Sequence, residues 1–233
     1  MATTEDVRPP LTGTATAEPL AELVRAALVL PLRRSAAATA VLAGLVVLAE
    51  TVGLVTRLTC RATTCAPWTA RLDLDALGSV PRLLVTSVLA VVALCCWWAV
   101  LRAGRHGAGI WWAVLGLGAS VLAAAKLTSL HSVLEDRLPD AQLVFLVVSL
   151  AGLAVAVVSG RWVRRGTRVA VVTWLALYAL ASVGLAAVSV VLAGAGTLPG
   201  DLASWVEETA EGLSAVGLLA AVAAQAREVS RRA

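Results

Sequence analysis

The chain contains very little of several residue types on which soluble proteins depend. Its 233 residues include one Phe, one Tyr, one Met, two His and a single Lys, and only 15% of them are charged. Soluble domains carry about 25% charged residues and about 45–50% apolar ones, whereas 59% of this chain is hydrophobic. A soluble fold of this size could not bury so much Ala, Val and Leu. We therefore predict that a lipid bilayer surrounds most of the chain.

The shortage of histidine and the missing motifs argue against several membrane chemistries. Haem between spans usually needs paired axial histidines, and this sequence offers only His106 and His131, which fall in separate loops. It contains no H-E-x-x-H zinc-protease motif and no Walker phosphate-binding motif. We predict no cofactor, no metal and no catalytic residue, and enzyme activity is less favoured than its absence. The net charge of +4 reflects arginines that set membrane topology, so we predict no nucleic-acid partner.

Six apolar segments are long enough to cross a bilayer, which requires about 20 residues at a rise of about 1.5 Å each. We predict an all-α bundle of six transmembrane helices over residues 35–55, 83–101, 109–130, 141–160, 169–195 and 202–226. The sixth segment is interrupted, because Glu207, Glu208 and Glu211 precede its clean apolar stretch. It either crosses the bilayer with these carboxylates inside or lies at the interface.

The arginines indicate the orientation of the bundle. With the N-terminus in the cytoplasm, 13 arginines fall on the inner side and five on the outer side, which obeys the positive-inside rule. A five-span chain would weaken this bias, so six spans with both termini inside are favoured. The outer loops then hold Arg57, Arg61, Arg71, Arg82 and Arg137. The excess of Arg over Lys, with abundant Ala, Val, Gly and Leu, is typical of a high-GC bacterium, and we predict its plasma (inner) membrane.

The chain outside the bundle is short. Residues 1–17 are polar and rich in Thr, Pro and Ala, which predicts a disordered cytoplasmic tail. Residues 18–34 show helical spacing of apolar positions and predict an amphipathic helix on the membrane surface. A helical lead-in to the first span is the alternative for that segment. The bundle then covers 35–226, and 227–233 form a basic cytoplasmic tail.

Four cysteines fall into two pairs. Cys60 and Cys65 lie in the long outer loop, in the oxidising compartment, which predicts a structural disulfide. Their spacing differs from the C-x-x-C of thiol-exchange enzymes. Cys95 and Cys96 lie near mid-membrane, where cysteine packs as a small hydrophobe.

Ionisable residues inside spans give the clearest indication of a site, because charge at membrane depth needs a partner or a task. Counted from the inner ends of their spans, Glu50, Lys126 and Glu211 all lie about 22–26 Å deep. We predict that Lys126 pairs with Glu208 or Glu211, with Glu50 nearby, in a polar pocket that opens outward and has His131 at its mouth. Two structural alternatives stay open, namely an ion-pair cluster that fixes helix packing and separate side chains that reach the headgroups. For Glu207 alone, Ser204 to Glu207 fits a capping box that starts the sixth helix.

These features support three functions of different classes. The first is a ligand-binding or accessory membrane subunit, with the lipid bilayer and a second membrane protein or another copy as partners. The second is a small transporter of a cation, an amine or protons, and the third is an intramembrane enzyme that uses a glutamate as acid or base. No loop is large enough to carry a soluble activity, which favours the first.

Overall fold

The computed structural model describes residues 36–62, 65–74, 76–103, 107–130, 134, 137 and 140–230, with side chains as far as Ala226. The predicted tail (1–17) and interfacial helix (18–34) lie outside the described residues. Within them the chain is almost wholly helical and contains no strand, which confirms the all-α bundle.

Ten helical elements follow one another in the described chain. They are α2 (Ala36–Ala62), η1 (Pro67–Leu72), α3 (Val80–Ala103), α4 (Gly107–Thr128), α6 (Ala141–Ser159), η2 (Gly160–Trp162), α7 (Arg165–Ala179), η3 (Leu180–Leu185), α8 (Ala186–Ala195) and α9 (Thr197–Ser230). Segments η1 and η2 are 3₁₀-helical, and η3 is a π-helical turn inside the continuous α7–α8 helix. Six stretches are long and apolar enough to cross a membrane, so the chain is a multi-pass membrane bundle.

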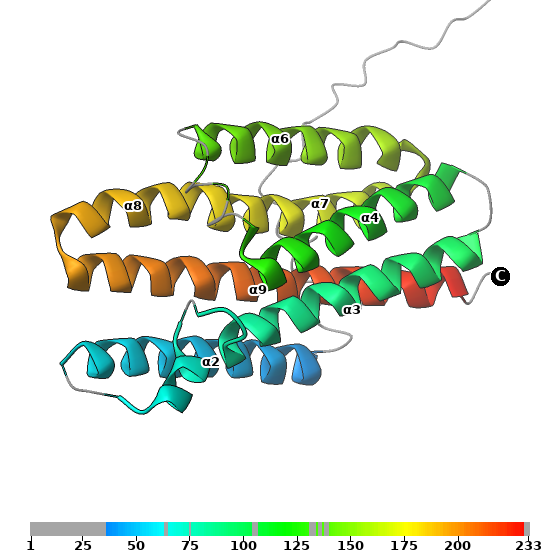
Figure 1. The fold of residues 1–233 in the computed structure, drawn as a ribbon. Coiled ribbons are helices and arrows are strands. Elements are labelled where there is room, and N and C mark those ends of the chain that lie inside the picture. The colour runs from blue at the N-terminus through cyan, green and yellow to red at the C-terminus, as the bar shows by residue number, and fades with distance from the viewer. Residues whose placement is uncertain are drawn as a thin grey trace, which may run out of the picture.

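Helix α9 forms the centre of the bundle (Figure 1). It contacts α2, α3, α7, η3 and α8, and it is the most enclosed of the six spans although it is the least apolar. Its glutamates are therefore surrounded by protein instead of lipid, which explains how a segment interrupted by charge can span. Helix α6 lies at the opposite extreme, because it packs mainly on α4 and α7 and leaves most of its surface exposed.

Two of the predicted spans were too short at one end. Helix α2 runs to Ala62 instead of residue 55, so Arg57, Cys60 and Arg61 are helical. Helix α9 begins at Thr197 instead of residue 202, and Gly196 alone separates it from α8. Gly196 has φ 143°, a conformation that only glycine adopts readily, and this allows the chain to reverse in one residue.

The connection between α2 and α3 folds back along α2 toward the middle of the bundle (Figure 1). Gly53 makes this possible, because a Cβ there would lie 2.9 Å from the backbone of Leu74. An ion pair of 2.6 Å between Arg57 and Asp73 joins the same two segments. Helix α3 therefore starts well inside the end of α2. We call the side that holds the α2–α3, α4–α6 and α8–α9 connections the predicted outer side.

Candidate functional site

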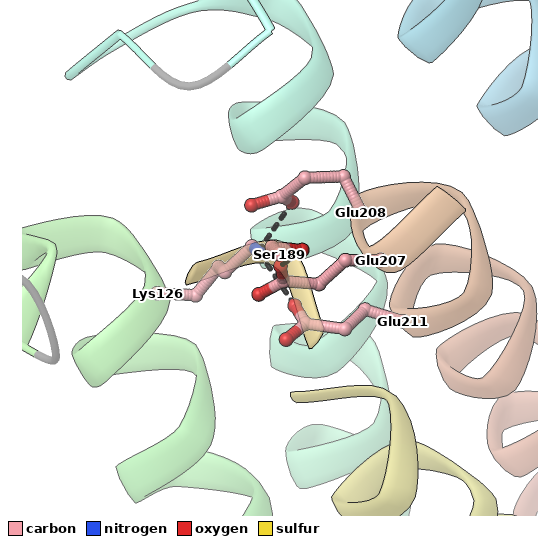
Figure 2. Close-up of polar contacts among 5 residues, drawn as sticks. All are labelled: Lys126, Ser189, Glu207, Glu208 and Glu211. Carbon is pink, nitrogen blue, oxygen red and sulfur yellow. Dashed lines mark hydrogen bonds and ion pairs between the residues drawn. The ribbon is translucent and has the colours of Figure 1, made fainter. Parts of the chain in front are cut away.

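The single lysine of the chain joins two carboxylates on the central helix. Lys126 Nζ lies 2.5 Å from Glu208 Oε2 and 2.6 Å from Glu211 Oε2, and it donates a hydrogen bond to each. Figure 2 shows both glutamates extending from α9 toward the end of α4. Helix α4 packs chiefly on α3, so the long lysine side chain is what reaches across to α9. Its position in the last turn of α4 also suits a cation, because the helix dipole is negative there.

These charges belong to a layer that lies one helical turn from an apolar core cluster. Four residues of that cluster, each from a different helix, are Val46, Val85, Ala123 and Ala215. Residues three or four positions apart lie on the same face of a helix. On each helix, the residue three or four positions from the cluster residue, toward the predicted outer side, is ionisable. These residues are Glu50, Arg82, Lys126 and Glu211, one turn from Val46, Val85, Ala123 and Ala215 respectively. With Glu208 these residues are at most 6% exposed, and we call them the buried charge layer.

Arg82 is the member of this layer that the sequence analysis misplaced. It was predicted to lie in the outer loop, but it sits in the first turn of α3 and is 2% exposed. The reason is the fold-back of the α2–α3 connection, which brings the start of α3 to the depth of the layer. Arg82 interacts electrostatically with Glu211. Pro81, a residue suited to a first helical turn, was the sequence signal that could have placed Arg82 inside the helix.

Glu207 lies at the margin of the layer and is only partly buried. Its Oε2 accepts a hydrogen bond of 2.7 Å from Ser189 Oγ of α8 (Figure 2). The predicted capping box from Ser204 to Glu207 is wrong, because α9 begins at Thr197 and both residues are inside the helix. Glu207 thus links α9 to α8 instead of starting a helix.

The structure closes the layer instead of opening it outward. Glu50 is completely buried, and the exposed fractions of Lys126, Glu208 and Glu211 are 5–6%. None of these four residues lines either of the two cavities described below. His131, predicted at the mouth of a pocket, lies outside the described residues. The Lys126 ammonium, bound by two carboxylates of α9, can hold α4 against α9.

The predicted disulfide between Cys60 and Cys65 is present in the structure. It joins the last turn of α2 to the start of the connection that folds back. The neighbouring Arg61 contacts the buried Asp201 of α9 at 2.7 Å, close enough for an ion pair although the groups are not aligned as a hydrogen bond. The disulfide therefore sits where α2 is fastened to the central helix.

A cavity of about 380 Å³ lies among α3, α4, α6, α7, η3 and α9, and Tyr178 belongs both to its lining and to the core cluster. No charged side chain is among the described residues that line it. Tyr178 is the only tyrosine of the chain. It borders the cavity and also interacts electrostatically with Lys126, Glu208 and Glu211. The cavity and the buried charge layer are therefore neighbours.

Small residues from three helices are among those that line the cavity. They include Gly118 and Ala119 of α4, Gly152 and Ala156 of α6, and Ala179 of α7. A Cβ added at Gly118 or at Gly152 would meet nothing within 4 Å. A second hollow of about 410 Å³ lies among α4, α6 and η2, but far fewer residues line it.

Comparison with protein-family models, curated proteins and solved structures gave no match for this chain. The case for a function therefore rests on the geometry of the cavity and of the buried charge layer.

Proposed function

We propose that this protein is a ligand-binding membrane protein that holds a lipid-soluble molecule in the cavity between α4, α6 and α7. The cavity itself carries the proposal. At about 380 Å³ it falls within the range of about 300–1,000 Å³ that is typical of small-molecule sites. Its lining is almost wholly apolar, as in most such sites.

The position of the cavity suits a ligand that arrives through the bilayer. Four of its lining residues are also strongly exposed on the outside of the bundle, namely Leu117, Val121, Val148 and Val155. They belong to α4 and α6, so the cavity reaches the surface between these helices. A molecule dissolved in lipid could enter there without crossing water.

The buried charge layer supports the site without binding the ligand. Lys126 fastens α4 to α9, and both helices contribute to the cavity wall. The ammonium is held by both carboxylates within the protein, beside Tyr178, so it is not available to a ligand. This arrangement favours the ligand-binding interpretation over transport of a cation, for which the apolar core cluster would interrupt any polar path.

We place the protein in the plasma membrane of a high-GC bacterium, with both ends of the bundle in the cytoplasm. The arginine bias supports this orientation. The cavity then lies within the bilayer, with Tyr178 toward the outer leaflet.

The test uses a decane that carries a photoreactive diazirine, in membranes that contain the protein. We expect crosslinks to concentrate on cavity residues of α4 and α6, to saturate with probe, and to be displaced by unlabelled decane. Gly118→Leu fills the cavity and should abolish this saturable labelling. Gly44→Leu is the matched control, because Gly44, like Gly118, is exposed with open space around it, but it does not line the cavity. Labelling that is unchanged by Gly118→Leu would overturn the proposal.

A further inference from the structure

The lining of the cavity is graded from one end to the other. Ser149 of α6, Tyr178 of α7 and Ser182 of η3 are hydroxyl residues that lie toward the predicted outer side. The opposite end is formed by valines, namely Val114, Val155, Val171 and Val222. From Ser182 to Val171 the helix rises by about 16 Å. The cavity is thus long, with a polar end and an apolar end.

Three hydroxyl groups lie at the polar end of the cavity. Several other hydroxyls in these helices donate to the carbonyl four residues earlier, and this holds for Thr51, Thr59, Ser87, Ser120, Thr128 and Ser159. The hydroxyls of Thr86 in α3 and Thr209 in α9, in contrast, are buried without a hydrogen-bond partner, but neither residue lines the cavity. Ser149, Tyr178 and Ser182 make no side-chain hydrogen bond in the described part of the chain. Hydroxyls beside apolar surface cost free energy when they lack a partner, so they are available to a ligand.

The backbone at this end is also unusual. Ser182 lies in the π-helical segment Leu180–Leu185, one turn beyond Tyr178 on the same face of the helix. Single π-helical turns break the regular hydrogen-bond pattern and are frequent at functional sites. The π-helical turn coincides with the polar end of the cavity and with no other part of it.

We infer that the ligand is a neutral amphipathic lipid whose single hydroxyl or carbonyl group binds at Ser149, Tyr178 and Ser182. This inference rests on the proposed function and names the class of ligand. Its hydrocarbon part lies between the valines at the opposite end. The described lining residues provide no charge to neutralise a phosphate, carboxylate or ammonium headgroup. The nearest cation, Lys126, is held by Glu208 and Glu211.

The experiment labels membranes that contain the full chain with the photoreactive decane. It compares four unlabelled competitors of equal chain length, namely decane, decanol, decanoate and decylamine. One net hydrogen bond is worth about 0.5–1.5 kcal/mol, so decanol should compete about 2- to 12-fold better than decane for saturable labelling. Ser182→Ala should remove most of that preference and leave decane unchanged. Ser87→Ala is the control, because Ser87 bonds within α3 and lies outside the cavity lining.

The possible results separate the two proposals. Equal competition by decane and decanol would overturn the neutral headgroup, while saturable decane labelling would leave the proposed function standing. Better competition by decanoate or decylamine than by decanol would overturn the neutral headgroup in favour of a charged one. A preference for decanol that survives both Ser182→Ala and Tyr178→Phe would overturn the binding of the headgroup at these hydroxyls. If Gly118→Leu does not reduce labelling by the photoreactive decane, the proposed function is overturned as well.

Discussion

At the scale of single residues, Lys126 is the side chain on which most depends. It is the only lysine of the chain, it is 5% exposed, and it holds two carboxylates from a helix that α4 does not closely pack against. Buried ion pairs add little compared with apolar replacements, but removing one partner leaves an uncompensated charge. Lys126 is therefore important mainly because it lowers the free-energy cost of burying the Glu208 and Glu211 carboxylates.

Lys126→Met should lower the free energy of unfolding by about 3–5 kcal/mol. The triple variant Lys126→Met, Glu208→Gln, Glu211→Gln should recover most of this loss, because neither carboxylate that Lys126 held is left charged. Denaturation in mixed micelles, followed by circular dichroism, measures both. Arg71→Met is the control, since Arg71 is exposed in η1, and it should change stability by no more than about 0.5 kcal/mol. Equal losses for Lys126→Met and Arg71→Met would contradict a structural role for the pair.

The contact between Lys126 and its carboxylates could be anticipated because it depends on a rise per residue and little else. Counting about 1.5 Å per residue from the span ends predicted one depth for Glu50, Lys126 and Glu211. Arg82 could not be placed in this way. Its position follows from the fold-back of the α2–α3 connection, which depends on Gly53 packing against Leu74, two residues far apart in the sequence.

At the scale of helices, packing of α9 depends on glycine at defined contacts. A Cβ at Gly212 would lie 2.4 Å from Val46 Cγ1, and one at Gly217 would lie 2.3 Å from the ring of Trp174. These glycines let α2 and α7 approach the central helix closely, as small residues do in membrane bundles. The same reasoning explains why the cavity was not predictable. The sequence alone does not tell which glycine is packed and which is open, and only the helix pairing shows that open space lies beside Gly118.

Gly217→Ala should therefore destabilise the bundle by about 1–3 kcal/mol, because the indole of Trp174 must move from a packed position. Gly44→Ala makes the same chemical change in an open position on α2, where it should stabilise by about 0.5–1 kcal/mol through helix propensity. Unfolding of the two variants under identical micelle conditions measures the difference. Equal effects would show that α7 and α9 adjust freely and that the close contact is not required.

At the scale of the whole molecule, orientation in the membrane decides where the polar end of the cavity and the disulfide lie. The fold alternates sides at each of the six spans, so the side of one connection fixes all the others. Trp68 of η1 lies on the predicted outer side and is 63% exposed. Gly166, in the first turn of α7, lies on the opposite side, with nothing within 4 Å of an added Cβ.

A membrane-impermeant maleimide added to intact cells should therefore label Trp68→Cys and leave Gly166→Cys unlabelled until the cells are permeabilised. The physical reason is the arginine bias, 13 against five, which opposes translocation of the inner loops. Cys60 and Cys65 form a disulfide in the structure, so this pair should contribute no background, and its predicted place outside the cytoplasm suits a disulfide that persists. The reverse labelling pattern would invert the bundle and place Tyr178 in the inner leaflet, so a neutral lipid would then enter from the cytoplasmic leaflet. Labelling of both sites in intact cells would mean that the six spans do not all cross.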